Sequence, residues 1–245
     1  MDFRKITSTL APMIAVGMAA ALSGCHNGEI SLHGAGKPLA ELDLSGPAPS
    51  GVVVLGPDAV RIEPGEKLAI KVEGDPTQAN HLRFTLKDGT LGVMRDTKGW
   101  DNTGGPVSVL VTMPAPKSLT MTGSGRITAA ELAREAQINI VGSGDIDTPK
   151  VEGDKLDISI GGSGTYRGAG SIADLKVNIA GSGSAEMAPL KADKADISIL
   201  GSGGAQLASD GTVKASMMGS GSVHVKGRAK CEVSAMGSGK LVCEP

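Results

Sequence analysis

The tripeptide Gly-Ser-Gly recurs through the second half of this chain at steps of 18 to 20 residues. So regular a period is typical of proteins built from stacked repeats, in which each unit packs only on its neighbours. The seven copies are Gly123-Ser124-Gly125, Gly142-Ser143-Gly144, Gly162-Ser163-Gly164, Gly181-Ser182-Gly183, Gly201-Ser202-Gly203, Gly219-Ser220-Gly221 and Gly237-Ser238-Gly239. We therefore expect residues 118–245 to be the regular repeats of one stack.

The residues around each Gly-Ser-Gly alternate between apolar and polar. The column two residues before the first glycine is apolar in every copy: Met121, Ile140, Ile160, Ile179, Ile199, Met217 and Ala235. A weaker alternation follows the tripeptide, with one apolar column of Ile127, Ile146, Tyr166, Ala185, Ala205, Val223 and Leu241. A period of two is typical of strands with one buried face. We therefore expect at least two strands in each repeat, joined at a corner where glycine tolerates positive φ.

The column five residues before the glycine alternates in charge over the last five copies. Its members are Asp157, Lys176, Asp196, Lys214 and Glu232. Neighbouring strands lie about 4.8 Å apart, and like charges directly opposite one another would destabilise a sheet. The pattern therefore favours parallel stacking in register. The expected fold is all-β: a parallel β-helix or β-roll solenoid of about seven Gly-Ser-Gly coils with an irregular β cap at its N-terminal end.

Residues 45–117 lack the period, but short extended segments separated by turn signals continue through them. These segments are Gly51–Leu55, Val60–Ile62, Leu68–Val72, Leu82–Leu86, Thr90–Met94 and Val107–Met113. An open stack exposes strand edges at its ends. We therefore expect residues 45–117 to supply the first coils and a cap, so that 45–245 form a single domain.

The N-terminus carries a sorting signal. Arg4 and Lys5 precede an apolar run from Leu10 to Leu22, which is too short to span a bilayer as a permanent helix, for which about 20 residues are needed. Residues 1–24, followed by Cys25, resemble a bacterial lipoprotein signal peptide with its lipobox. The resemblance implies cleavage before Cys25 and acylation of that residue, for example with palmitate. An ordinary secretory signal with an incidental cysteine is the alternative.

The residues after Cys25 indicate where the protein would be held. His26 stands where an aspartate would imply retention in the inner membrane, so the resemblance implies transfer to the outer membrane. Residues 25–44 include several glycines and predict a flexible tether between the lipid and the domain. Whether the domain faces the periplasm or the outside stays open.

Composition excludes some classes of function and constrains the cysteines. Without residues 1–24 the net charge is −3, which does not favour nucleic acid as a partner. Thiols are oxidised outside the cytoplasm, so we expect a disulfide between Cys231 and Cys243 at the C-terminal end. Two separate buried thiols are the alternative.

The sequence predicts no catalytic residues, metal site or cofactor. The nearest cluster of acids and bases comprises Asp145, Asp147, Arg126 and Arg167, which we interpret as surface ion pairs rather than the two-carboxylate site of a carbohydrate-active enzyme. A calcium site at 142–147 is a weaker alternative, because the other coils lack these aspartates. The glycine-rich segment 34–38 lacks the spacing of a phosphate loop. The four histidines have no metal-ligand spacing: His26, His33, His81 and His224.

The column just before each corner predicts a contact surface near the C-terminal end. Strand parity points Leu200, Met218 and Met236 outward, and exposed apolar stripes often mark interaction sites. The alternative is that the backbone bends and tucks these side chains into the core. The hypothesis is a surface for a partner or for self-association.

The order of several segments resembles a known family. These segments are Gly56–Ile62, Lys71–Asp75, Lys87–Leu91 and Val109–Pro114, followed by the Gly-Ser-Gly repeats. Together they resemble the auto-transporter adhesin head domain, also called the GIN domain, over residues from about 50 to 240. The resemblance implies a β-helical stack in a secreted or lipid-anchored bacterial protein, and it brings no catalytic residues.

The expected function is that of a lipid-anchored envelope protein with a non-catalytic head for adhesion or other macromolecular contacts. The membrane, through the N-terminal lipid, and a cell-surface glycan or protein are the expected partners. A periplasm-facing structural or accessory lipoprotein is the first alternative. A carbohydrate-active β-helix enzyme is the second.

Overall fold

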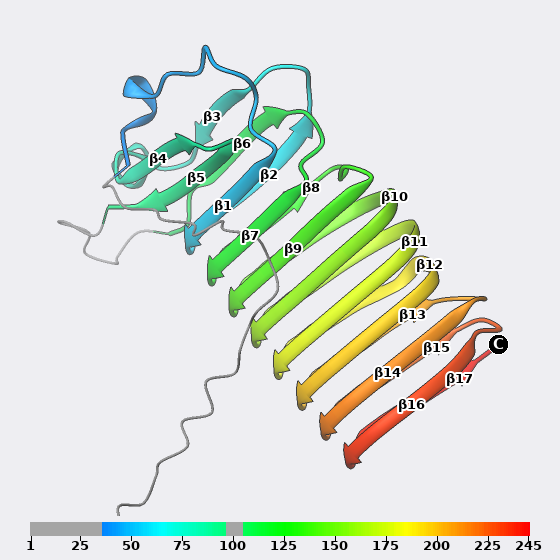
Figure 1. The fold of residues 1–245 in the computed structure, drawn as a ribbon. Coiled ribbons are helices and arrows are strands. Elements are labelled where there is room, and N and C mark those ends of the chain that lie inside the picture. The colour runs from blue at the N-terminus through cyan, green and yellow to red at the C-terminus, as the bar shows by residue number, and fades with distance from the viewer. Residues whose placement is uncertain (1–35, 97–104) are drawn as a thin grey trace, which may run out of the picture. The chain divides into compact units, whose positions relative to one another are not determined.

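Strands form where the sequence alternates, and each strand lies beside its counterpart in the next coil (Figure 1). The structure is a computed structural model, and it describes residues 36–96 and 105–245. These residues belong to one compact unit. The expected parallel β-solenoid of about seven Gly-Ser-Gly coils is confirmed.

The regular coils are built from eleven strands among the described residues. They are β7 (Ser118–Gly123), β8 (Arg126–Ala129), β9 (Glu135–Gly142), β10 (Asp145–Gly162), β11 (Thr165–Gly181), β12 (Ser184–Gly201), β13 (Gly204–Ala208), β14 (Thr212–Gly219), β15 (Ser222–Lys226), β16 (Lys230–Gly237) and β17 (Lys240–Glu244). β10, β11 and β12 each continue from the start of one coil into the next, with register shifts where they bend. A coil therefore has a glycine corner at one side and a bend or turn at the other.

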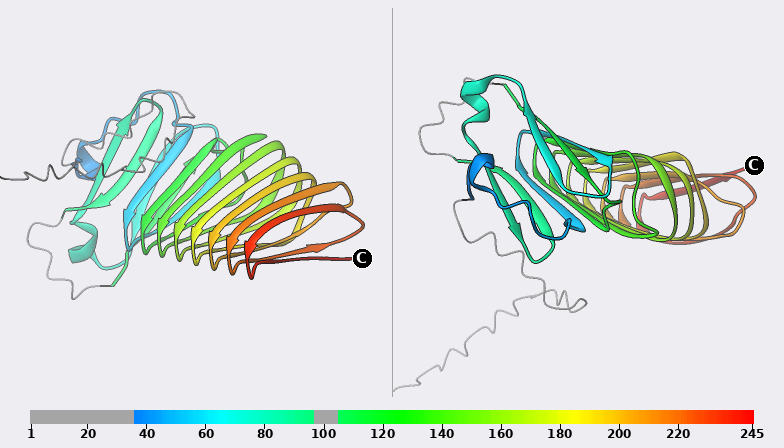
Figure 2. Two further views of the ribbon diagram at one scale, coloured as in Figure 1. Left: turned by 60° about the horizontal axis from the view of Figure 1, so that its bottom comes forward. Right: turned by 90° about the horizontal axis from the view of Figure 1, so that it is seen from above.

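All strand pairs among these coils are parallel, and they make two sheets. We call one the pre-corner sheet; it contains β7, β9, β14, β16 and the second halves of β10, β11 and β12. The other, the post-corner sheet, contains β8, β13, β15, β17 and the first halves of β10, β11 and β12. The two further views in Figure 2 show the coils following one another along the stack.

The N-terminal part adds two coils and a cap. Its elements are η1 (Leu39–Glu41), β1 (Gly51–Gly56), β2 (Ala59–Pro64), β3 (Ala69–Glu73), α1 (Pro76–Ala79), β4 (Leu82–Lys87), β5 (Thr90–Arg95) and β6 (Ser108–Met113). β1 and β2 extend the two sheets by pairing in parallel with β7 and β8. β5 and β6 then pair in parallel on the far side of β1 and β2. The first coil in sequence is therefore the second in the stack.

Antiparallel strands close this end. β4 pairs antiparallel with β5, and β3 pairs antiparallel with β6. The edge of β4 is partly covered in turn, because Lys37 and Phe84 exchange backbone hydrogen bonds of 2.8 Å. An exposed edge invites pairing with another chain, so this arrangement protects the N-terminal end of the stack.

Residues 37–42 lie against the domain, although the sequence predicts a flexible tether over 25–44. Leu39 and Leu42 pack on the hydrophobic core, and η1 contacts β4. The reason is physical: two leucines can bury apolar surface here, which the glycine content of the segment does not reveal. The signal peptide predicted over residues 1–24 and the predicted acylation site at Cys25 lie outside the described residues.

Inward side chains of both sheets form one hydrophobic cluster. Every residue two positions before a corner from Met121 to Met217 is buried, and so is every member of the apolar column after the corner from Ile127 to Val223. Most are aliphatic, because stacked small and branched side chains fill the narrow space between the sheets. Tyr166 and Phe84 are the largest fully buried side chains among the described residues.

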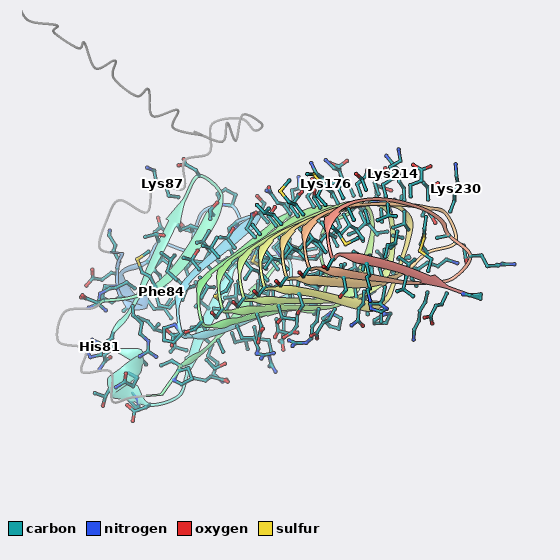
Figure 3. All side chains as sticks on the ribbon, turned by 90° about the horizontal axis from the view of Figure 1, so that it is seen from below. His81, Phe84, Lys87, Lys176, Lys214 and Lys230 are labelled. Carbon is teal, nitrogen blue, oxygen red and sulfur yellow. A yellow bond between two sulfur atoms is a disulfide. The ribbon has the colours of Figure 1, made fainter. Side chains whose placement is uncertain are left out.

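The charge ladder is confirmed in its register. Asp157 is opposite Lys176, Lys176 opposite Asp196, Asp196 opposite Lys214 and Lys214 opposite Glu232. In Figure 3, Lys176 and Lys214 project from the same side of the stack. The alternation of sign in the sequence therefore reflects strand pairing, as the sequence predicts.

Candidate functional site

The corners bring the backbones of successive coils close together. The first glycine of each corner has φ between +113° and +124°, a region that side chains disfavour. At Gly201 an added Cβ would collide with the backbone oxygen of Gly181 in the preceding coil. The hydrogen-bond ladder also continues here, since the N–H of Ser202 donates to that same oxygen at 3.0 Å. The corners are thus structural elements of the stack.

The corner serines point outward, which the sequence leaves open. All seven are exposed: Ser124, Ser143, Ser163, Ser182, Ser202, Ser220 and Ser238. Their backbone N–H groups, rather than their hydroxyls, join neighbouring coils. The row of exposed hydroxyls therefore lines one side of the stack and is available to solvent.

The outer surface of the pre-corner sheet carries three parallel columns. Next to the corner lies an apolar stripe, which comprises Val141, Gly161, Ala180, Leu200, Met218 and Met236. Beside it runs a column of small polar residues, Thr120, Asn139, Ser159, Asn178, Ser198, Ser216 and Ser234. The charge ladder forms the third column.

The large residues of the apolar stripe are exposed. Leu200 retains 56% of its accessible surface, Met218 54% and Met236 69%. These values contradict the alternative in which a bend tucks the three side chains into the core. Among the described residues, the large exposed hydrophobic side chains are those three, Val141 and Val233, so four of the five lie in the stripe. Such a concentration is typical of an interaction surface.

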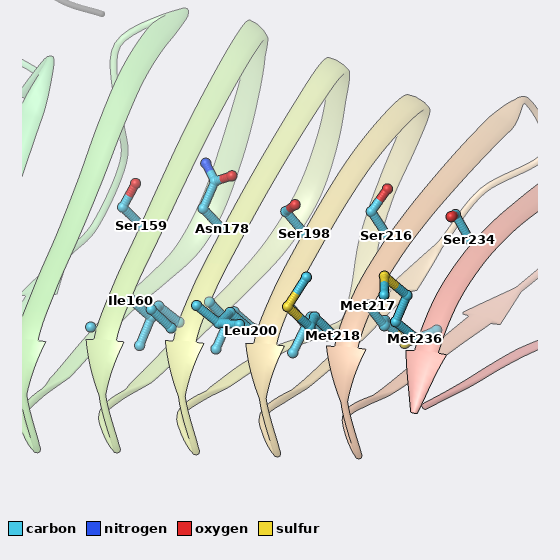
Figure 4. A pocket seen from close by; sticks show the side chains of 14 residues that line it. Ser159, Ile160, Asn178, Ser198, Leu200, Ser216, Met217, Met218, Ser234 and Met236 are labelled. Carbon is cyan, nitrogen blue, oxygen red and sulfur yellow. The ribbon is translucent and has the colours of Figure 1, made fainter. Parts of the chain in front are cut away.

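A groove of about 700 Å³ runs along this surface. Its lining comes from the polar column and the apolar stripe between Ser159 and Met236 (Figure 4). In Figure 4, Ser159, Asn178, Ser198, Ser216 and Ser234 form a row, and Leu200, Met218 and Met236 lie nearer the strand ends. The described lining residues include no acid, histidine or cysteine. The groove can therefore offer apolar contact and neutral hydrogen bonds, but no acid or base for catalysis.

A second groove, of about 500 Å³, lies on the post-corner sheet, and its lining includes Asp147 and Arg167, two of the four residues of the predicted cluster of acids and bases. Arg126 binds Asp145 at 2.6 Å and Asp147 at 2.8 Å. Arg167 approaches Asp147 at 3.4 Å and Glu186 at 2.9 Å. The arginines alternate with the carboxylates along the stack, which matches the surface ion pairs expected from the sequence. Arginine partners therefore bind each of these carboxylates.

Beneath the second groove lies a buried hydroxyl pair. The phenol oxygen of Tyr166 is 2.6 Å from the hydroxyl of Thr148, and both side chains are buried. Burial raises the pKa of Tyr166, while the hydrogen bond with Thr148 opposes the rise. Gly168 leaves space for this ring, because a Cβ there would lie 2.8 Å from the phenol oxygen. The pair is internal and satisfies its own polar atoms.

An additional corner and a buried ion pair are features that sequence reasoning missed. Gly56 has φ +121° and is paired with Gly123, so Gly56-Pro57-Asp58 occupies the place of a Gly-Ser-Gly. The Asp58 carboxylate is buried and accepts hydrogen bonds from Arg95 Nε at 2.7 Å and from the N–H of Val107 at 2.8 Å. The extended segment that ends at Gly56 is the sequence signal for this additional corner. It lies outside the 18- to 20-residue period of the Gly-Ser-Gly tripeptides.

The predicted disulfide is present in the last coil. Cys231 of β16 and Cys243 of β17 are joined, with their Cα atoms 6.9 Å apart. The bond therefore links the pre-corner and post-corner strands of the coil farthest from the cap.

Other site classes receive no support from the described residues. They contain no cluster of three or more histidine, cysteine or acidic side chains suited to a metal ion. They also contain no helix of the length and hydropathy needed to cross a membrane. His81 and His224 lie in different elements, and His26 and His33 lie outside the described residues.

Several solved structures share this fold. A "putative adhesin" from Bacteroides fragilis is 19% identical, with a TM-score of 0.75 over 81% of this chain and 93% of that chain. A "putative lipid binding protein" from Parabacteroides distasonis is 22% identical, with a TM-score of 0.60 over 81% and 93%. A "putative adhesin" from Parabacteroides merdae is 19% identical, with a TM-score of 0.62 over 81% and 92%.

Comparison at the level of sequence gives the family. No protein with a curated description matches the chain. Residues 48–229 match the family described as "Putative auto-transporter adhesin, head GIN domain". This range covers the cap, the first coils and all but the last of the Gly-Ser-Gly corners. The chain therefore belongs to the auto-transporter adhesin head GIN domain family.

Proposed function

We propose that this protein is a lipid-anchored component of the bacterial envelope whose non-catalytic head makes adhesive contacts with other macromolecules. The observation that carries the proposal is the groove on the pre-corner sheet, where an exposed apolar stripe runs beside a column of neutral polar side chains. Such a surface supports binding through apolar burial and hydrogen bonds. Membership of an adhesin head family supports the same role.

The chemistry of the two grooves supports a non-catalytic role. A glycoside hydrolase needs a general acid and a second carboxylate that flank one bond. The first groove has no carboxylate among its described lining residues. In the second, arginine guanidinium groups bind Asp147 and Glu186, so both carboxylates are engaged in ion pairs within the protein.

Anchoring at Cys25 completes the proposal. In this interpretation acyl groups on Cys25 anchor the chain in the outer membrane, and η1 of the same chain contacts β4 in the cap. A Cys25→Ser variant should be released from the membrane fraction and should not incorporate labelled palmitate. Incorporation that persists in this variant would contradict acylation at Cys25.

An attachment assay tests the contact role. Cells producing the wild-type chain or a Leu200→Ser, Met218→Ser, Met236→Ser triple variant would be applied to surfaces coated with glycans or matrix proteins. Gln206→Ser with His224→Ser is a matched control, because both side chains are exposed on the other sheet. We expect the triple variant alone to lose attachment, with circular dichroism unchanged. Equal attachment by all three strains would overturn the assignment of the groove.

A further inference from the structure

Two properties of the pre-corner sheet change from coil to coil along the stack: the side-chain size in the apolar stripe and the sign of the charge in the ladder. In the stripe, the small Gly161 and Ala180 follow Val141 and precede the large Leu200, Met218 and Met236. The ladder reverses its sign at each coil from Asp157 to Glu232. Both columns lie on one sheet face. A partner that covers this face must therefore be complementary to the stripe in shape and to the ladder in charge.

We propose that the partner of this surface is a second copy of the same chain, packed face to face across a two-fold axis parallel to the strands. Such an axis preserves positions along each strand and reverses the order of coils. It therefore places stripe on stripe, polar column on polar column and ladder on ladder. A two-fold axis along the stack would instead set the apolar stripe against the charge ladder, which would bury charges without partners.

The charge ladder restricts where this axis can lie. If the axis passed through a single coil, such as that of Asp196, then Lys176 would face Lys214 of the second copy. An axis midway between two coils sets opposite charges against each other. With the axis between the coils of Lys176 and Asp196, these two residues face one another across the interface, and Asp157 faces Lys214. Such complementarity favours an axis between two coils over an axis through a coil.

The sizes of the stripe residues select the same register. With that axis, Ala180 faces Leu200 of the second copy, Gly161 faces Met218 and Val141 faces Met236. Leu200 and Met218 then enter the low places left by Ala180 and Gly161, which is the arrangement that fills space between two sheets, and Met236 packs on Val141. Moving the axis by one coil toward the C-terminus keeps opposite charges together but sets Leu200 against Met218. The charge ladder therefore requires an axis between two coils, and the sizes of the stripe residues select the one between the coils of Lys176 and Asp196.

The state of Lys176 is consistent with a partner outside the chain. Within the described residues it forms no ion pair, whereas Lys214 lies 3.9 Å from Glu232 and Lys194 lies 3.9 Å from Asp196. In the dimer the Lys176 ammonium gains the Asp196 carboxylate of the second copy. Because the contact forms twice in a two-fold dimer, each charge counts twice.

The area indicates a weak dimer. Six coils at a strand spacing of about 4.8 Å and columns covering about 15 Å give a footprint of roughly 400–500 Å² per copy. A standard interface buries about 800 Å² per partner. We therefore expect association that depends on concentration, and anchoring in a shared membrane would favour it.

The test uses two single charge reversals and their mixture, followed by sedimentation equilibrium. Asp196→Lys alone sets lysine against lysine in the homodimer, and Lys176→Asp alone sets aspartate against aspartate. Each should weaken association at least about tenfold. In the mixture, the intact Lys176 of one chain meets the intact Asp196 of the other, and the introduced lysine meets the introduced aspartate. The mixture should therefore dimerise about as well as the wild type.

Lys226→Asp is the matched control, because it makes the same change of charge on the post-corner sheet, where Lys226 is exposed. It should associate like the wild type. Ala180→Arg provides a second route, since it adds bulk opposite Leu200 at an exposed position and should abolish the dimer. Thermal melts establish that each variant is folded.

The outcomes separate this inference from the proposed function on which it rests. A wild-type chain that stays monomeric up to about 1 mM, which corresponds to an association of about 4 kcal/mol, would overturn the dimer. So would a mixture that fails to restore association. If the dimer fails while the triple serine variant still loses attachment, the contact role stands with a different partner.

Discussion

At the scale of single residues, the first glycine of each corner allows the backbones of two neighbouring coils to approach closely. Gly201 has φ +123°, and an added Cβ would collide with the Gly181 oxygen. Gly201→Ala should therefore lower the free energy of unfolding by about 2–4 kcal/mol. The adjacent Ser202→Ala removes only an exposed hydroxyl and should change it by less than about 0.5 kcal/mol. Urea unfolding measures both, and equal effects would contradict this view of the corner.

Tyr166 should make stability sensitive to alkaline pH. Burial holds the pKa of its phenol above the ordinary value of 10.0, so the folded state keeps the proton longer than the unfolded state. This contribution is fully present below pH 10 and is lost as the pH rises beyond it. Tyr166→Phe lacks the dependence, but leaves the Thr148 hydroxyl without its partner.

Urea unfolding of wild type and Tyr166→Phe between pH 8 and pH 11 provides the measurement. The wild type should be more stable by about 1 kcal/mol at pH 8, and its advantage should shrink above pH 10. An advantage that stays constant over the whole range would show that the phenol does not titrate on unfolding.

At the scale of elements, the buried ion pair between Asp58 and Arg95 fixes the cap to the stack. Asp58 belongs to the corner between β1 and β2, and Arg95 ends β5 in the neighbouring coil. Removing the Asp58 carboxylate takes away the opposite charge of the buried Arg95 guanidinium, so Asp58→Ala should lower the free energy of unfolding by about 3–5 kcal/mol. Arg126→Ala breaks exposed pairs and serves as the control, with little loss expected.

Hydrogen exchange shows where the loss acts. In Asp58→Ala, the amides of β5 and β6 should exchange faster, while those of β11 and β12 keep their protection, because a stack transmits stability mainly between neighbours. Loss of protection throughout the stack would contradict a local role for the pair.

The sequence predicts the strands of both halves because alternation is a local signal. The expected segments Leu82–Leu86 and Thr90–Met94, for example, lie within β4 and β5. The antiparallel cap and the place of β5 outside β1 could not be predicted, since pairing between Gly51 and Thr90 joins residues with no repeat in common.

The candidate site also combines features that the sequence predicts with features that only the structure shows. Parity pointed Leu200, Met218 and Met236 outward and the structure exposes them, but parity alone could not exclude a bend at the corner. The groove depends on how the stripe and the polar column stand together over several coils, which requires the register of the strands. Asp58 carried no signal, because a lone aspartate after Gly-Pro is typical of a turn.

At the scale of the whole molecule, an adhesive role requires the stack to be on the outside of the cell. The family and the exposed groove support contact with other macromolecules, and the family also supports a location in the bacterial envelope. An adhesive role therefore depends on which side of the outer membrane the stack faces, because a partner outside the cell can reach only a stack that is exposed on the cell surface.

Proteinase treatment of intact cells tests this requirement directly. The cells would produce the full chain with an epitope added after Pro245, and a periplasmic protein that must survive would serve as the control. Our account predicts that the epitope is lost from intact cells while the control protein persists. Protection of the epitope until the outer membrane is opened would contradict an adhesive role and would support a periplasm-facing accessory lipoprotein instead.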